Sequence, residues 1–140
     1  MKKMNNKGFS LVELIIVIAI MAILAAALAP QLIKYLEQSR ESTDASACDT
    51  IKSCFNAAMS TEKAYKEITG ATSGQTVSIE IGAKGVIGTK TNITTTTELE
   101  KELKSSLADL AAPKASGKTK YVLSYKLDGT TVTDITVVTA

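Results

Sequence analysis

The chain has 140 residues, with 16 lysines and arginines against 14 acidic residues and a net charge of +2. Histidine and tryptophan are absent and the sequence holds two cysteines, which removes the commonest general base and the usual zinc ligand sets. Basic residues do not gather beside aromatic ones, so the surface expected of a nucleic-acid-binding protein is missing. The sequence therefore predicts a non-enzymatic protein with no catalytic residues, no metal, no cofactor and no nucleic acid contact.

An apolar segment runs from Phe9 to Ala29 and is interrupted by a single charged residue, Glu13. About 20 apolar residues are enough for a helix to cross a bilayer. Three lysines precede the segment: Lys2, Lys3 and Lys7. An unpaired carboxylate inside a bilayer costs roughly 2.5–3.5 kcal/mol, so Glu13 is a candidate functional residue until its partner is found. Cleavage after Gly8 would supply that partner, because it would create a new α-amine on Phe9.

These residues resemble the prepilin signal of type IV pilins and pseudopilins. The resemblance rests on the basic leader, Gly8, the string Phe9-Ser10-Leu11-Val12-Glu13-Leu14, the apolar run and Ala29-Pro30-Gln31. It implies that a membrane-embedded prepilin peptidase cuts between Gly8 and Phe9 and methylates the Phe9 amine. It also implies that Glu13 and Pro30 serve assembly into a helical homo-oligomeric filament, built by the pilus assembly machinery in the membrane.

Two other classes of protein begin with a basic and then an apolar segment. In a secretory signal peptide the apolar stretch is typically 7–15 residues and ends in a small-residue cleavage site, which Ala25-Ala26-Ala27 and Leu28-Ala29 could imitate. The length of Phe9–Ala29 and the charge of Glu13 argue against such a discarded signal. An ordinary single-span membrane protein, whose head binds a ligand without polymerising, is the alternative from a different class.

The resemblance divides the chain into a leader peptide (1–8), a transmembrane or filament-core helix (9–29) and an amphipathic helix with a globular head (30–140). The leader holds three of the 16 basic residues, so 13 remain against 14 acidic ones after its removal. The positive-inside rule keeps the N-terminus cytoplasmic. We therefore expect a single-pass protein of the cytoplasmic membrane before assembly, and an extracellular filament afterwards.

From Phe9 to about Thr69 the sequence contains no glycine and one proline, Pro30, which predicts a single helix over this range. Pro30 lacks a backbone donor and its ring clashes with the carbonyl of Ala26, so it predicts either an opening between Ala26 and Ala29 or a gentle bend. For the isolated subunit we expect the bend. The resemblance implies that the segment before Pro30 unwinds in the filament and makes it extensible.

Beyond Pro30 the helix becomes amphipathic. At 100° per residue, one apolar stripe, interrupted by Glu62 and Lys66, collects eight residues: Ala47, Cys48, Ile51, Cys54, Phe55, Ala58, Met59 and Tyr65. We expect this stripe to pack on the head and Gly70 to end the helix in the left-handed conformation. On a helix, the Cα atoms of Cys48 and Cys54 would lie roughly 10 Å apart, beyond the reach of a disulfide, so free thiols are expected. Related pilins often close a C-terminal loop with two cysteines, and this chain departs from that pattern.

Alternating or β-branched segments predict the strands of the head. They are residues 75–81, 120–127 and 131–138, with a short strand near Val86-Ile87 after a turn at 82–85. Thr97 and Glu100 form a capping-box pattern and leucines follow at helical spacing, which predicts a helix from Thr97 to about Ala111.

Asp128-Gly129 predicts a hairpin between the last two strands. A two-residue turn would place Leu123 opposite Asp134, whereas a three-residue loop at 127–129 with a glycine bulge would place Tyr121 opposite Ile135. We favour the bulged register, because it gives the hairpin one apolar face.

Together these features predict an α+β fold, in which a long N-terminal helix packs on a small antiparallel sheet with a second short helix. The predicted function is that of a structural subunit of a type IV pilus, which would serve adhesion, motility or DNA uptake. A pseudopilin of a type II secretion or competence system is the alternative within the same class.

Overall fold

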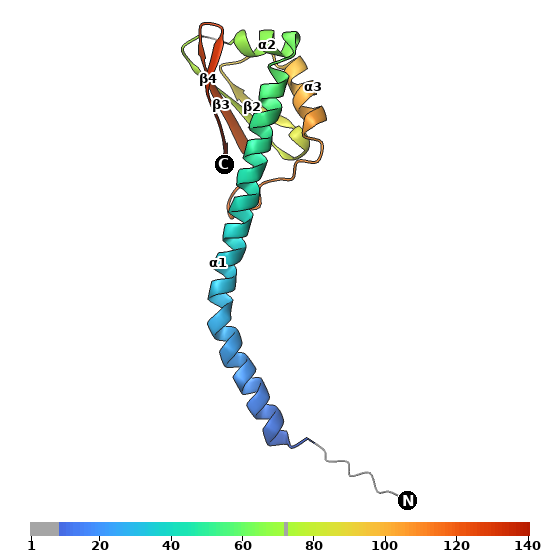
Figure 1. Cartoon of the computed structure of the whole chain (residues 1–140), viewed down its shortest axis with the longest axis vertical. Helices are drawn as coiled ribbons and strands as arrows, with labels where there is room; N and C mark the ends of the chain where they lie inside the picture. The colour runs from blue at the N-terminus through green and yellow to red at the C-terminus, as the bar shows by residue number, and fades with distance from the viewer. Residues whose placement is uncertain (1–8, 72) are drawn as a thin grey trace, which may run out of the picture. The chain divides into compact units, whose positions relative to one another are not determined.

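The computed structural model describes residues 9–71 and 73–140. The chain divides into two compact units, residues 1–38 and residues 39–140. Helix α1 (Leu11–Ala58) belongs to both units. Its residues up to Gln38 lie in the first unit, and its residues from Ser39 onward lie in the second. The second unit also holds helices α2 and α3 and a four-stranded antiparallel sheet (Figure 1). The predicted α+β fold with a long N-terminal helix is therefore confirmed.

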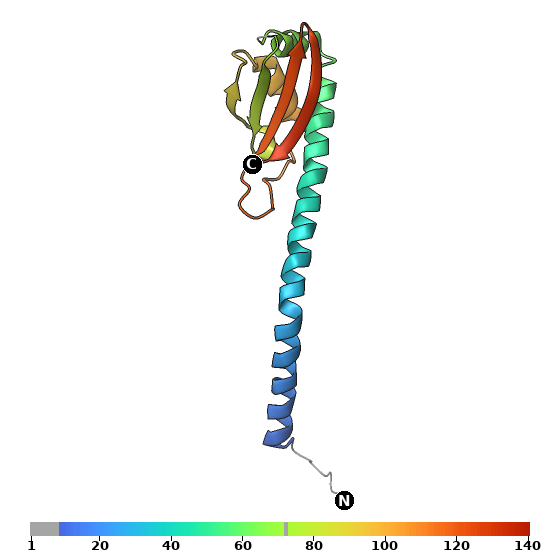
Figure 2. The same ribbon diagram turned by 90° about the vertical axis from the view of Figure 1, so that its left-hand side faces the viewer.

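The sheet has the strand order β2-β1-β3-β4 (Figure 2). Its strands are β1 (Thr76–Ile81), β2 (Ile87–Thr91), β3 (Tyr121–Asp128) and β4 (Thr131–Thr139). The 3₁₀ turn η1 (Ala83–Gly85) joins β1 to β2. Gly85 has φ 67°, and a Cβ there would lie 2.9 Å from the Leu103 carbonyl, so glycine is required for both its backbone angle and its close packing.

The hydrophobic core lies between the sheet and the helices of the second unit. Alternate residues of β3 are fully or almost fully buried, as their period-two pattern predicts. From α1 come Ile51, Phe55 and Ala58, with Phe55 and Tyr125 in aromatic contact at a ring-centroid distance of 5.1 Å. The predicted stripe is thus correct over this part of α1, where Ala47, Cys48 and Cys54 are partly buried against the same core. Met59, just after the helix, is partly buried there too.

The prediction of one unbroken helix to Thr69 was wrong. Helix α1 ends at Ala58 and α2 spans Glu62–Thr69. Between them the N–H groups of Ser60 and Thr61 each bond to the carbonyl three residues earlier, which forms a tight turn. The turn changes the helical phase, so Ala64 and Ile68 are fully buried whereas Tyr65, which the stripe included, is 38% exposed.

Gly70 does not adopt the predicted left-handed conformation. Its φ and ψ are −72° and −5°, and its N–H closes the last turn of α2 on the Lys66 carbonyl. The helix therefore ends through a right-handed turn, and the first glycine with positive φ after it is Gly74, at 82°.

Both predicted registers of the β3–β4 hairpin were wrong. Asp128 pairs with Thr131, so the loop consists of Gly129 and Thr130, and the far end pairs Tyr121 with Thr139. The bulge lies inside the hairpin, between the pairs Ser124–Thr136 and Lys126–Thr133. Within that bulge Asp134 has φ 51°, and the extra residue brings Val132, Ile135 and Val137 to the core despite their broken alternation.

Helix α3 (Thr97–Ser106) is shorter than predicted and starts from a different cap. The N-cap residue is Thr96, not Thr97, and the Thr96 hydroxyl contacts the Glu100 carboxylate at 2.6 Å. The helix ends before Leu107 rather than near Ala111, because the following residues turn to bury Leu107 and carry the chain toward β3.

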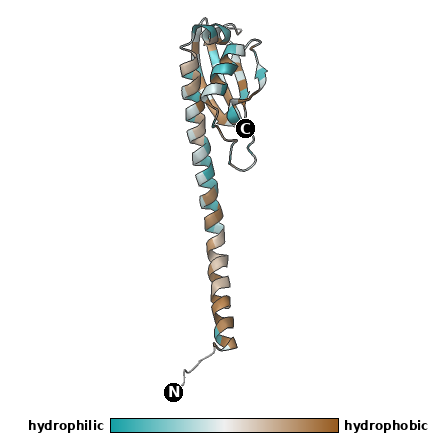
Figure 3. Cartoon of the chain, turned by 90° about the vertical axis from the view of Figure 1, so that its right-hand side faces the viewer, coloured by the Kyte–Doolittle hydropathy of each residue, from teal (hydrophilic) through white to brown (hydrophobic). Residues whose placement is uncertain are grey.

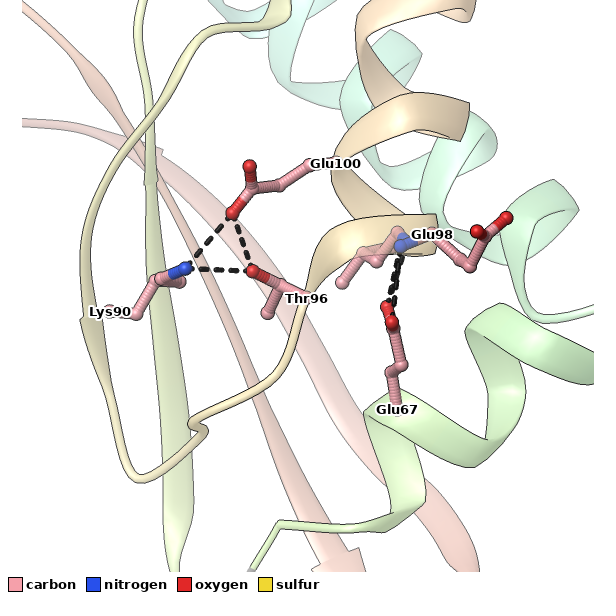
Figure 4. A network of polar contacts seen from close by, with 6 residues as sticks. Glu67, Lys90, Thr96, Glu98 and Glu100 are labelled. Carbon is pink, nitrogen blue, oxygen red and sulfur yellow. Dashed lines mark hydrogen bonds and ion pairs between the residues drawn. The ribbon is translucent and has the colours of Figure 1, made fainter.

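Glu67 on α2 caps the N-terminus of a different helix, α3. Its carboxylate accepts the backbone N–H groups of Glu98 and Leu99 at 2.9–3.1 Å (Figure 4). These N–H groups belong to the first turn of α3, where backbone donors have no acceptor within the helix. Glu67 therefore joins α2 to α3.

Candidate processing and assembly site

The start of α1 places Glu13 at the N-terminus of a helix. The Ser10 N–H donates to Glu13 Oε2 at 2.9 Å, and the Ser10 carbonyl accepts the Leu14 N–H at 3.3 Å. Ser10 and Glu13 thus stand as the first and fourth residues of a capping-box pattern, a signal that the sequence interpretation missed. An acidic group in this first turn is also favoured by the helix dipole. Glu13 therefore has a partner within its own chain.

The residues around Glu13 are apolar and exposed. Phe9 is 88% exposed, and the large apolar residues of α1 up to Leu36 are exposed by half or nearly half of their surface or more. Figure 3 shows the first part of α1 coloured mostly in the brown of hydrophobic residues. Within the described residues, α1 is the one helix long and apolar enough to cross a membrane, with a mean hydropathy of 3.0 in its most apolar window.

Pro30 lies inside α1, and the residues from Ala26 to Ala29 are all helical. The helix is not opened between Ala26 and Ala29, which agrees with our expectation of an unbroken helix for the isolated subunit. The Ala26 carbonyl still lacks the hydrogen bond that a residue other than proline would donate, so this turn has one bond fewer than its neighbours.

The polar residues of the second unit hold the head together. Lys90 donates hydrogen bonds to Thr96 and Glu100 at 2.8 and 2.9 Å (Figure 4). Hydrogen bonds from Thr96 and from Lys90 to the Glu100 carboxylate hold the pKa of Glu100 below its usual value. Lys120 pairs with Glu80 in the same way and lowers the pKa of that carboxyl. The first ion pair joins β2 to α3, and the second joins β1 to the residue that precedes β3.

Asp44 on α1 is a buried functional group that the sequence did not reveal. It is 3% exposed, and its carboxylate accepts the backbone N–H groups of Lys114 and Ala115 at 2.8–3.0 Å. Its position next to the apolar stripe gave no signal, because a sequence pattern does not show which backbone donors will face it. Asp44 fixes the segment between α3 and β3 on α1.

Cys48 and Cys54 are both free and partly buried, as predicted. Burial raises the pKa of both thiols, and the charges of Asp44 and Asp49 raise that of Cys48 further. Neutral thiols at these positions are poor nucleophiles and metal ligands. Across residues 9–71 and 73–140, no cluster of three potential metal ligands is present.

Residues 3–29 match a family model described as the prokaryotic N-terminal methylation motif. This is the segment that contains Gly8, Phe9 and Glu13. The chain carries the signal of type IV pilins and pseudopilins. Comparison with curated proteins and with solved structures gave no match. The likeness to pilins therefore rests on the N-terminal signal, and the long apolar helix and the α+β arrangement are consistent with it.

The structure brings together some of the predicted pilin site and not all of it. Phe9, Ser10 and Glu13 lie together at the start of α1, and Pro30 lies farther along the same helix. Gly8, on the other side of the predicted cleavage point, lies outside the described residues. The prepilin signal implies processing by a prepilin peptidase and contact with membrane machinery.

Proposed function

We propose that this protein is the structural subunit of a type IV pilus. Hydrolysis of the Gly8–Phe9 peptide bond would release the leader and leave an α-amine on Phe9, which the peptidase then methylates. The observation that carries the proposal is the match of residues 3–29 to the methylation motif. The uncovered apolar surface of α1 supports it, because a surface of this size needs lipid before assembly and other subunits after it.

The proposed role of Glu13 is to pair with the Phe9 amine of a neighbouring subunit. Once both groups leave water, each charge requires a partner, since removal of one side of a buried pair costs about 3–5 kcal/mol. A subunit that docks out of register would leave its own Glu13 carboxylate and the Phe9 ammonium of a neighbour without partners. The pair therefore selects one axial position for each incoming subunit.

The apolar residues of α1 would supply the packing of the filament core. Lipid tails are as apolar as leucine, so transfer from lipid to a helix bundle gains van der Waals contact rather than hydrophobic free energy. The alanines at 25–27 and 29 let neighbouring helices approach closely. Pro30 would permit the preceding turn to open under tension, because one hydrogen bond is already missing there.

Electron microscopy of cells that express the protein, with immunogold labelling of the head, tests this function. Labelled surface fibres built from the processed chain are the expected result. Labelled protein confined to the envelope as short fibres would identify a pseudopilin. Processed protein that never polymerises would contradict the proposal and favour a membrane protein with a ligand-binding head.

A further inference from the structure

Strands β2 and β4 form the two edges of the sheet, and each directs backbone groups away from its partner strand (Figure 2). Just outside the β3–β4 ladder, Lys120 and Ala140 exchange both backbone hydrogen bonds, at 3.2 and 2.8 Å. Bonded and non-bonded pairs alternate along an antiparallel ladder, so Val137 and Thr139 direct their N–H and C=O groups away from β3. The same alternation, followed across β3 and β1, directs those of Lys90 away from β1.

The edge formed by β4 lacks the usual protection against pairing with another strand. Lysine and proline commonly guard such an edge, and β4 contains neither. Its one charged residue, Asp134, lies in the bulge, and the run from Thr136 to Thr139 pairs with β3 in regular register. A hollow of about 470 Å³ lies beside Val137 and Thr139 and is lined on its other side by α1. The last part of β4 is therefore open to a further strand.

The edge formed by β2 is also exposed and complements β4 in charge. All residues of β2 except the half-buried Ile87 are exposed. Lys90 does not guard this edge, because its ammonium is bonded to Thr96 and Glu100 on the side of the sheet that faces α3. Lys90 is the one charged residue of β2 and Asp134 the one charged residue of β4. Electrostatic complementarity therefore favours contact between unlike edges.

The directions of the strands also favour contact between unlike edges. Each strand is antiparallel to its neighbour in the order β2-β1-β3-β4, so β2 and β4 run in opposite directions. In the proposed filament every subunit points the same way. When two such heads stand side by side, β4 of one and β2 of the next are antiparallel, which is the more stable pairing. Two β4 strands would instead run parallel, and a contact between identical edges closes after two copies.

From this arrangement we infer that β4 of one head pairs with β2 of a neighbouring copy of the chain and joins their sheets into one antiparallel sheet. The inference rests on the proposed filament. Lys90 would stand opposite Val137 or Thr139 of the neighbour, since these residues direct their backbone groups outward. Each head would keep one edge for the next copy, so the contact extends along a fibre and does not close. Backbone hydrogen bonds between heads would then add to the packing of α1.

Cysteine cross-linking on whole fibres tests this contact. The two registers place Thr91 opposite either Thr136 or Val138 of the neighbour, and all three residues are exposed. Such flanking, non-bonded pairs have Cα atoms about 4.5 Å apart, within disulfide range. Within one chain the two positions are three strand spacings apart, roughly 14 Å, which excludes an internal disulfide. The native thiols are removed first, by replacing both cysteines with alanine.

In that background, fibres of Thr91→Cys/Thr136→Cys and of Thr91→Cys/Val138→Cys are oxidised and separated on a denaturing gel. We expect one of the two double variants to give a ladder of dimers, trimers and larger species. The same variant, oxidised as unassembled protein in detergent, and each single variant in fibres should remain monomeric.

Monomers alone from intact fibres of both double variants would overturn the inferred contact and leave the proposed function intact. Dimers from fibres of Thr136→Cys or Val138→Cys alone would also overturn it, because they would show two β4 strands in contact. If electron micrographs show no fibres of the unmodified protein, both the proposed function and the contact that depends on it are refuted.

Discussion

Substitution of Asp44 tests how the head is held on α1. The Asp44 carboxylate is 3% exposed and accepts three hydrogen bonds from the backbone of Lys114 and Ala115, at 2.8, 3.0 and 2.8 Å. Asp44→Ala leaves both N–H groups without this acceptor in a part-buried site. A stranded buried donor costs about 1–3 kcal/mol. Because these two donors are only part-buried, we take about 1–2 kcal/mol for each and expect a total loss of about 2–4 kcal/mol in the free energy of unfolding.

For a unit of about 100 residues, each kcal/mol lowers the melting temperature by about 4–8 °C, so the expected fall is about 8–30 °C. Thermal unfolding followed by circular dichroism measures it. Asp44→Asn keeps one acceptor oxygen and should lose about half as much. Asp49→Ala, which removes an exposed carboxylate from the same helix, should change stability by no more than about 0.5 kcal/mol. If the melting temperature of Asp44→Ala lies within about 2 °C of that of the unmodified protein, the Asp44 hydrogen bonds do not stabilise the head as predicted.

Three further predictions concern the N-terminal segment. Glu13→Gln should be cut after Gly8 and stay in the membrane, but form few or no filaments by electron microscopy. A glutamine can still accept the Ser10 N–H and keep the cap, so normal fibres in this strain would show that charge plays no part. Gly8→Val should retain the leader by mass spectrometry and abolish fibres, because a bulkier residue would not fit the peptidase; normal processing would contradict the cleavage assignment. A fragment of residues 36–140 should be a soluble monomer by size-exclusion chromatography, since the membrane-seeking residues precede it, and membrane retention of the fragment would show that the division is wrong.

Local patterns in the sequence predicted most of the elements. Apolar length predicted the start of α1, period-two alternation predicted β1 and β3, and the β-branched run predicted β4. These signals depend on neighbouring residues alone, so a single sequence contains them in full. The Cys48 and Cys54 prediction also succeeded, because helix geometry fixes their separation.

The errors arose where distant parts of the chain decide the local structure. The break at Met59–Thr61 contains neither proline nor glycine, and it exists because the turn allows Ala64 and Ile68 to reach the core. We predicted a bulge in the hairpin loop at 127–129, whereas the bulge lies inside the hairpin, next to Asp134. The inference that the hairpin needs an extra residue to keep one apolar face was correct. Helix α3 starts at a cap completed by Glu67, which lies on another helix.

The candidate site shows the same division between local and distant information. The prepilin signal was found from Gly8, Phe9 and Glu13 together with the apolar run, because a peptidase reads a short linear segment. The Ser10–Glu13 bond was overlooked, although its spacing is a known helix-start pattern. Asp44 had no sequence signal, since its donors lie 70 and 71 residues away.

The N-terminal sequence and intact mass of the protein purified from membranes test the central claim most directly. We predict a chain that begins at Phe9, with the mass of residues 9–140 plus one methyl group on the N-terminal amine. A chain that begins at Met1, or one cut after Ala27 or Ala29, would contradict the pilin-like assignment.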